Sequence, residues 1–158
     1  AITSAKNYIY IQTPYLLPTE VILVALKTSA LSGVDVRIMI PEHSDSRMVH
    51  WGTCSYLEEL MEAGVRIYMY QKGFLHSKLM VSDDSLASVG STNIDFRSFE
   101  HNFEVNAFMY DRTSALMMKE IFLSDQKDAK LLHLKEWRMR PWSQKVKESV
   151  IRLFAPLL

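Results

Sequence analysis

The chain has 158 residues, of which 48% are hydrophobic and 23% charged, and this composition excludes a largely disordered protein. Eighteen basic residues balance eighteen acidic ones, which argues against a protein that coats nucleic acid. The one cysteine, Cys54, excludes an intrachain disulfide and a cysteine-rich metal site, and we expect it to be a buried structural residue. The longest apolar run, over 21–26, is far shorter than the roughly 20 residues that span a bilayer.

The first seventy residues alternate between strand-like and helix-like segments. Strands are expected over Tyr8–Gln12, 34–40 and 65–70, and helices over 19–32 and 46–63. Both helices end at a glycine that leads directly into the next strand. This order is typical of right-handed crossover units and a mainly parallel sheet.

The pattern changes in the second half of the chain. Strands over 75–81 and 86–89 flank Ser82–Ser85, which is typical of a hairpin turn. We therefore expect one α/β domain over 1–158 with a mixed, mainly parallel central sheet. The remaining expected elements are a strand over 103–110 and helices over 114–123 and 143–155.

The residues with the clearest chemistry lie in the predicted hairpin. His76 and Lys78 are two positions apart in an expected strand, so both side chains should project from the same face. An imidazole beside a fixed ammonium group suits a phosphate substrate, because lysine attracts the phosphate oxygens and histidine can attack phosphorus or move a proton. Asp83 has the opposite parity and lies at the turn, which favours a turn-fixing role.

Further polar residues follow the hairpin. Gly90 permits close backbone approach and unusual φ values, while Ser91 and Asn93 offer short hydrogen-bonding side chains at the end of a strand. Glu104 begins the next strand, where its carboxylate could hold the second ring nitrogen of His76.

Together these residues form the pattern His76-x-Lys78-x4-Asp83-x6-Gly90-Ser91-x-Asn93, with Glu104 beyond it. The pattern resembles the HKD motif of the phospholipase D superfamily at every motif position. Other segments, among them 11–15, 33–41, 64–68 and 152–158, resemble the C-terminal half of a bacterial cardiolipin synthase. The resemblance covers nearly the whole chain and implies a phospholipase D-like half, an α-β-α sandwich excised from a longer tandem protein.

The resemblance also implies a reaction. It is phosphatidyl transfer with phosphatidylglycerol as donor, a phospholipid headgroup as acceptor and glycerol as leaving group, and it needs no metal and no cofactor. His76 is implied to be either the nucleophile that forms a phosphohistidine or the general acid/base. Lys78, Ser91 and Asn93 are implied to bind phosphate, Glu104 to orient His76, and Asp83 to complete the motif in a structural role.

The chain contains one such motif, whereas the superfamily builds its site from two. The implied partners are therefore a second HKD half, in the same full-length chain or in a homodimer mate, and the anionic phospholipids phosphatidylglycerol and cardiolipin. We expect the isolated chain to be inactive on lipid unless it dimerises across the motif face. The implied location is the cytoplasmic side of the bacterial inner membrane, with this fragment a soluble, peripheral domain of a membrane-anchored protein.

Two alternatives stay open from the sequence. One is a phospholipase D-like phosphodiesterase or nuclease that acts as a homodimer, although a nuclease should carry a basic groove. The other is a catalytically silent domain that binds lipid or a protein partner. The leading interpretation includes no nucleic acid.

The end of the chain is basic, with eight Lys or Arg and three Asp or Glu over 127–158. Its segment 131–142 mixes leucines, Trp137 and Trp142 with Lys and Arg, which is compatible with contact to an anionic bilayer. Ordinary packing, with apolar residues inward and charges in water, is the favoured alternative. His43, His50 and Cys54 lack the spacing of zinc ligands.

Overall fold

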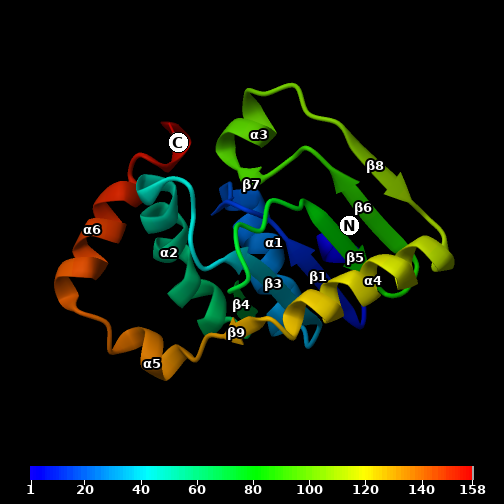
Figure 1. Cartoon of the computed structure of the whole chain (residues 1–158), viewed down its shortest axis with the longest axis horizontal. Coiled ribbons are helices and arrows are strands. Elements are labelled where there is room, and N and C mark those ends of the chain that lie inside the picture. The colour runs from blue at the N-terminus through cyan, green and yellow to red at the C-terminus, as the bar shows by residue number, and fades with distance from the viewer. Residues whose placement is uncertain (158) are drawn as a thin grey trace.

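A computed structural model describes residues 1–157, which form a seven-stranded sheet with helices on both faces (Figure 1). The sheet order is β8-β6-β5-β1-β3-β4-β9, and β2 and β7 form a separate small pair. The strands are β1 (Tyr8–Gln12), β2 (Leu16–Leu17), β3 (Asp35–Pro41), β4 (Arg66–Tyr70), β5 (Leu79–Ser82), β6 (Leu86–Gly90), β7 (Ile94–Asp95), β8 (Asn106–Met109) and β9 (Ala129–Leu131). The helices are η1 (Ile2–Ser4), α1 (Glu20–Leu31), α2 (Arg47–Glu62), α3 (Phe96–Glu100), α4 (Arg112–Gln126), α5 (Leu134–Arg138), α6 (Trp142–Arg152) and η2 (Ala155–Leu157).

The centre of the sheet is parallel and its two sides are antiparallel. Strands β1, β3 and β4 run in the same direction and are joined through α1 and α2, as the two predicted crossover units require. On one side β5, β6 and β8 follow in antiparallel pairs, and on the other β9 pairs antiparallel with β4. The predicted mixed α/β fold class is confirmed.

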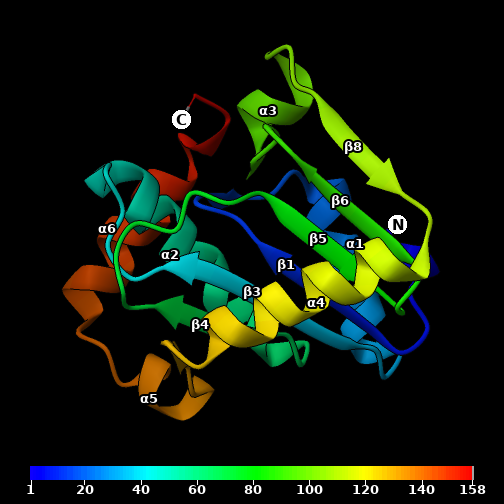
Figure 2. The same ribbon diagram turned by 45° about the vertical axis from the view of Figure 1, so that its right-hand side comes forward.

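The side chains of the central strands alternate between two apolar cores. Ile9 and Ile11 of β1 face the helices α1 and α2, whereas Tyr8 and Tyr10 face Phe122 of α4. Figure 2 shows α4 lying across one face of the sheet, with α1 and α2 on the other. The result is the three-layer arrangement that the resemblance implies.

Several element boundaries differ from those predicted. The strand expected over 75–81 begins only at Leu79, because its neighbour β1 ends at Gln12, the residue that pairs with Leu79. The strand expected over 103–110 is shortened to Asn106–Met109 because β6, its one partner in the sheet order, ends at Gly90. The hairpin turn is where it was predicted, and Asp83 and Asp84 adopt the positive φ values of 50° and 53° that Asp tolerates in such turns.

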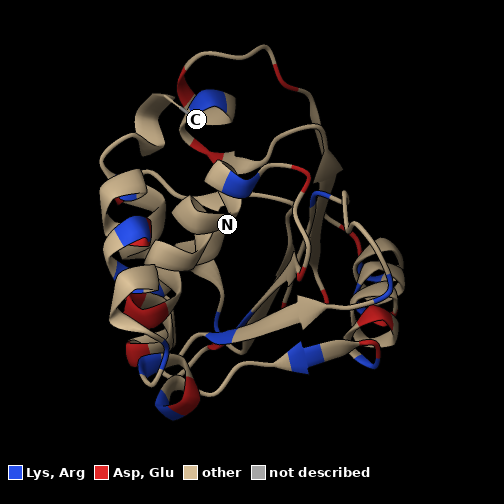
Figure 3. Cartoon of the chain, turned by 60° about the vertical axis from the view of Figure 1, so that its left-hand side comes forward, with Lys and Arg blue, Asp and Glu red and all other residues tan. Residues whose placement is uncertain are grey.

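The C-terminal helices α5 and α6 pack against α2 and extend its layer. Figure 3 shows many charged residues along the helices and fewer in the strands of the sheet. Trp137 packs on the core from α5, and Arg138 is paired with Glu58 and Glu62 of α2. Ordinary packing thus accounts for these two residues. Within residues 1–157, no helix has the length and apolar character needed to cross a bilayer.

Candidate active site

His76 and Lys78 lie in an extended segment just before β5 rather than inside a strand, which corrects the prediction. Their side chains nevertheless meet. Lys78 Nζ is 3.1 Å from both His76 ring nitrogens and donates a 3.0 Å hydrogen bond to the His76 carbonyl oxygen. His76 is exposed and Lys78 is half-buried. An imidazole and an ammonium group therefore share one accessible point at the entrance to the hairpin.

The surroundings of Lys78 lower the pKa of its ammonium group. Partial burial lowers the pKa of Lys78 below its ordinary value, and the negative charges of Glu104 and Asp95 oppose this shift without cancelling it. Burial removes water from the ammonium group and so penalises its charged form. The two carboxylates thus compensate only part of the effect of burial. An anion that reached Nζ of Lys78 would further stabilise its charged form.

Ser91 and Glu104 form a tight cluster beside Gly90. Ser91 Oγ donates a short hydrogen bond to Glu104, and Ser98 Oγ and Asn102 Nδ2 each donate to the same carboxylate at 3.2 Å. The hydrogen bond from Ser91 lowers the pKa of Glu104 most, so the carboxylate is held ionised. At Gly90 any Cβ would collide with the Val105 carbonyl and the Asn106 side chain, which confirms close approach; its φ is not positive.

The expected hydrogen bond between Glu104 and His76 is absent from the described residues. The Glu104 carboxylate is occupied by three local donors, and the polar contacts of His76 are all with Lys78. The expected contact is therefore corrected for this chain. Glu104 instead fixes the Ser91 hydroxyl and adds its charge to the field at Lys78.

Asn93 follows β6 in the short link to β7, and its backbone N–H donates to Ser98 Oγ at 3.2 Å. Its side-chain Oδ1 is enclosed and has no hydrogen-bond partner within residues 1–157. Asn93 and Lys78 line the same hollow. A buried polar atom without a partner is uncommon, so this amide is a place where a ligand's hydroxyl group would gain a hydrogen bond.

Asp83 lies at the far end of β5, about 16 Å of extended chain from Lys78. Its carboxylate accepts hydrogen bonds from the backbone N–H groups of Lys6 (2.7 Å), Asn7 (2.9 Å) and Tyr8 (2.9 Å). Burial by itself would raise the pKa of Asp83, but these three donors outweigh it and the pKa is lowered. Asp83 thus anchors the start of β1 to the hairpin and does not touch His76 or Lys78.

A hollow of about 400 Å³ opens beside Lys78 and Asn93. It is lined by residues of η1, α1, α3, β1, β5, β6 and β8, and most of its lining is apolar. The apolar residues include Val21 and Ile22 of α1, Met80 of β5, Phe99 of α3 and Phe108 of β8. The site therefore combines a cationic, amide-bearing rim with an apolar interior.

Sequence reasoning assigned no role to the residues that follow β1, although polar groups at the carboxyl end of a central parallel strand are a general signal for a site. The buried Gln12 accepts a 2.5 Å hydrogen bond from Ser77, the residue between His76 and Lys78, and donates to Asp125 of α4 at 2.8 Å. Tyr15 meets the His76 ring edge-on at 6.5 Å between centroids, and Phe74 lies 5.4 Å from it. The histidine is thus bordered by aromatic rings.

The family model described as "Cardiolipin synthase, PLD-like domain" matches residues 1–126, which include every residue of the motif. The chain belongs to this PLD-like domain family. The family assignment confirms the resemblance that the motif indicated.

Curated relatives of this PLD-like domain carry the same name. Over 157 residues the chain is 52% identical to a cardiolipin synthase of Geobacillus sp. (strain WCH70), and 48% identical to cardiolipin synthase 1 of Staphylococcus epidermidis. In each case 99% of this chain is covered, but only 31% and 32% of the relative. The chain therefore spans about a third of the length of the curated relatives it matches.

Solved structures share the fold of the PLD-like domain at lower identity. The phosphatidylserine synthase of Haemophilus influenzae superposes with a TM-score of 0.78 and 17% identity, over 99% of this chain and 43% of that one. The phospholipase D family member Nuc of Salmonella typhimurium superposes with a TM-score of 0.72 and 23% identity, over 84% and 86%. At these identities the likeness establishes the fold.

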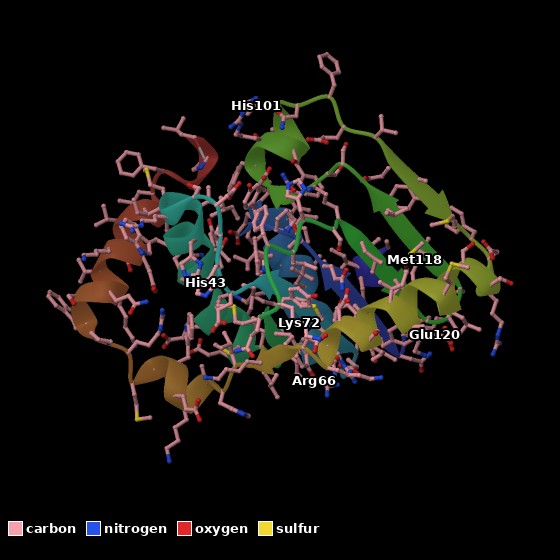
Figure 4. All side chains as sticks on the ribbon, in the orientation of Figure 1. His43, Arg66, Lys72, His101, Met118 and Glu120 are labelled. Carbon is pink, nitrogen blue, oxygen red and sulfur yellow. The ribbon has the colours of Figure 1, made fainter. Side chains whose placement is uncertain are left out.

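Among the described residues, no other histidine makes a hydrogen bond with His76 or Lys78. Figure 4 shows His101 projecting outward at the end of α3 and His43 in the loop before α2. His50 Nε2 is 3.5 Å from the buried Cys54 Sγ, and burial raises the pKa of that thiol to about 12. Cys54 is buried as predicted and stays protonated. Among residues 1–157, no three His, Cys, Asp or Glu side chains gather as metal ligands would.

Proposed function

We propose that this chain is one half of a cardiolipin synthase-type phosphatidyltransferase. The observation that carries the proposal is the contact between His76 and Lys78 at the rim of a hollow that also presents Asn93. Membership in the PLD-like domain family and relatives named cardiolipin synthase support the same chemistry.

The proposed reaction is two displacements at one phosphorus atom. In the first, an imidazole nitrogen forms a P–N bond while the bond from phosphorus to the glycerol oxygen breaks, and the second histidine of the complete site protonates the leaving alcohol. In the second, that histidine removes the proton of the acceptor hydroxyl, a new P–O bond forms and the P–N bond breaks. His76 takes one of these two roles.

Lys78 has the clearest electrostatic part in this scheme. Its ammonium group would stabilise the negative charge on the phosphoryl oxygens, and Asn93 would orient a substrate hydroxyl or phosphoryl oxygen from the same side. Ser91 would act together with Glu104, because its hydroxyl proton is already donated to that carboxylate. Asp83 would contribute by fixing the hairpin.

The second half of the site is proposed to cover the hollow. The flank around it carries large exposed apolar side chains, with 77% of Val21, 47% of Phe99 and 50% of Phe108 exposed. A second HKD-bearing half seated there would bury these residues and bring its own histidine toward His76. That half would come from the same longer chain or from a second copy, and the bound lipids would be anionic phospholipids at the bacterial inner membrane.

The test separates monomeric from dimeric chain by size exclusion and incubates each with vesicles that contain radiolabelled phosphatidylglycerol. Lipid extracts are analysed for cardiolipin and the aqueous phase for glycerol. We expect cardiolipin and glycerol to form in proportion to the dimer, and an acid-labile phosphate label to appear on wild-type protein but not on His76→Gln.

Four results would contradict the proposal. Transfer by a strictly monomeric sample would refute the half-site. Release of phosphatidic acid by the dimer without cardiolipin would indicate the phosphodiesterase alternative, and cleavage of plasmid DNA by the dimer would indicate a nuclease. A dimer that is inert in all these assays would indicate a silent binding domain.

A further inference from the structure

Helix α6 presents its apolar side to solvent and its polar side to the protein. Glu148 is only 3% exposed, and its carboxylate accepts hydrogen bonds from Arg140 at 2.6 and 3.0 Å and from Gln144 at 3.1 Å. On the opposite side of the helix, 78% of Trp142, 38% of Val146, 49% of Val150 and 79% of Leu153 are exposed. These four residues, which we call the α6 stripe, recur every three to four positions and so form one line along the helix.

This orientation has a cause in the charges beneath the helix. Arg152 pairs with Glu59 of α2, and Lys145 pairs with Glu58 of the same helix. These two contacts bind α6 to α2 through its polar face, and the Arg140–Glu148 pair ties the same face to the link from α5. The apolar face is then left outward. A helix of low mean hydropathy with one strongly apolar face is the type that lies in a membrane interface.

The charges without an ion-pair partner over 127–157 are mostly positive, and one of them, Lys147, lies on α6 itself. Over 127–157 every arginine is paired, whereas Lys127, Lys130, Lys135 and Lys147 have no ion-pair partner among the described residues. On the acidic side, Asp128 and Glu148 are paired and Glu136 is not. The charge that remains available in this segment therefore complements an anionic surface, and Lys147 places part of it beside the stripe.

We propose that the α6 stripe docks on an anionic phospholipid bilayer, with Trp142 and the two valines immersed at the level of the headgroups. The proposal rests on the proposed function in one respect, since that function requires substrates that reside in a bilayer. Tryptophan at the first position of α6 is suited to the boundary between headgroups and hydrocarbon, and the lysines are attracted by the surface potential of anionic lipid.

A second HKD half is a poorer occupant of this surface. No residue of the stripe lines the hollow beside Lys78. Figures 1 and 2 both place α6 at the edge of the molecule opposite β6 and β8, the strands that border the hollow. Leu153, at one end of the stripe, lines a second hollow together with Val21, so a partner that buries Val21 would reach that end. Trp142 lies about 16 Å away at the other end of α6 and would stay uncovered.

The experiment measures co-sedimentation of the chain with vesicles of equal parts phosphatidylglycerol and phosphatidylcholine, and with phosphatidylcholine alone. The test variant is Val146→Ser/Val150→Ser. Its matched control is Met117→Ser/Ile121→Ser, the same i, i+4 spacing of exposed apolar residues on α4 in the opposite layer. We expect at least about a fivefold loss of partitioning for the α6 variant and less than about twofold for the control, as the difference in immersed apolar area requires.

A second variant, Trp142→Ser, guards against a folding defect, because Trp142 is 78% exposed and supports no described core contact. It should lose binding while thermal unfolding stays as in wild type. Wild-type chain that fails to bind the anionic vesicles, or α6 variants that bind as wild type does, would overturn the proposal. Variants that turn a dimer into a monomer on size exclusion, with vesicle binding unchanged, would also overturn it and assign the stripe to self-association.

The assay reads binding and needs no turnover. A chain that sediments with anionic vesicles but transfers no phosphatidyl group supports the docking surface and counts against the proposed function alone. A chain that transfers the group as a dimer, with partitioning indifferent to the stripe, supports the function and counts against the docking surface.

Discussion

Between Phe74 and Glu104, Lys78 and Asn93 line a hollow and His76 contacts Lys78 at its rim, whereas in α6 the buried Glu148 points into the protein and apolar side chains face outward. The first region leaves His76 and Lys78 accessible and holds their neighbours by local hydrogen bonds. The second hides its charges as ion pairs with α2 and Arg140. An accessible polar cluster is suited to chemistry, and an outward apolar helix face is suited to attachment.

The largest effect is expected from replacing His76. If the rim carries the chemistry, His76→Gln should reduce cardiolipin formation by the dimeric chain at least about a thousandfold, as loss of a covalent catalyst does. Because His76 is exposed, the free energy of unfolding should change by less than about 0.5 kcal/mol. His101→Gln, an exposed histidine beyond α3, is the control and should leave transfer unchanged. Equal activity of both variants would contradict the assignment.

In the C-terminal layer the largest effect is expected on stability. Glu148→Ala removes the buried member of the pair with the half-buried Arg140, and breaking a buried pair costs about 3–5 kcal/mol. Urea denaturation measures the loss, and Glu136→Ala, at an exposed position with no ion pair among residues 1–157, is the control. A cost below about 0.5 kcal/mol for Glu148→Ala would show that the pair does not hold α6 in place.

Asp83 sharpens the contrast because it is a motif residue with an anchoring role. Asp83→Asn keeps the turn residue type but weakens three hydrogen bonds to backbone N–H groups, which should cost about 1–2 kcal/mol at neutral pH. The pKa of Asp83 is lowered in the folded chain, so its contribution is complete above the ordinary carboxyl pKa of about 3.9 and is lost as the pH falls through the folded value.

Denaturant titrations of Asp83→Asn and wild type at several pH values check this prediction. The two stability curves should converge in acid. A difference that is constant with pH would mean that the side chain's shape, and not its charge, fixes the hairpin.

The smallest effect concerns the field at the rim. Glu104→Gln removes one of the two negative charges that oppose the lowering of the Lys78 pKa, so that pKa should fall further. Nitrogen-detected NMR titration of the Lys78 ammonium group measures the shift directly. Glu100→Gln, another exposed acidic position, is the control. A rise in the Lys78 pKa would contradict the electrostatic role given to Glu104.

The motif and the crossover units were predictable because both depend on the spacing of residues that are close in the sequence. His76 and Lys78 meet as expected, and α1 and α2 are each followed after one capping residue by a glycine, Gly33 and Gly64, where φ values of 92° and 97° favour glycine. The proposed partnership of Glu104 with His76 failed because spacing does not reveal competing donors. Ser91, Ser98 and Asn102 satisfy the carboxylate first.

Long-range contacts could not be predicted from the sequence either. The outward face of α6 depends on Glu58 and Glu59, which precede it by about 90 residues and could not be matched to it from the sequence. The short pair of β2 and β7 was likewise missed, since two residues are too few for a periodic pattern. The sequence thus predicted most helices and strands, whereas the direction in which the α6 side chains face became clear only from the packing of the helix.

The side-chain amide of Gln12 has one further consequence, because its two ends are not interchangeable. Oxygen accepts from the Ser77 hydroxyl and nitrogen donates to the Asp125 carboxylate, so turning the group over would set the amide oxygen against an acceptor-only carboxylate. Gln12 thereby links Ser77, in the loop that carries His76, to Asp125 in the last turn of α4. A glutamate in the same place would put two like charges face to face and free the loop.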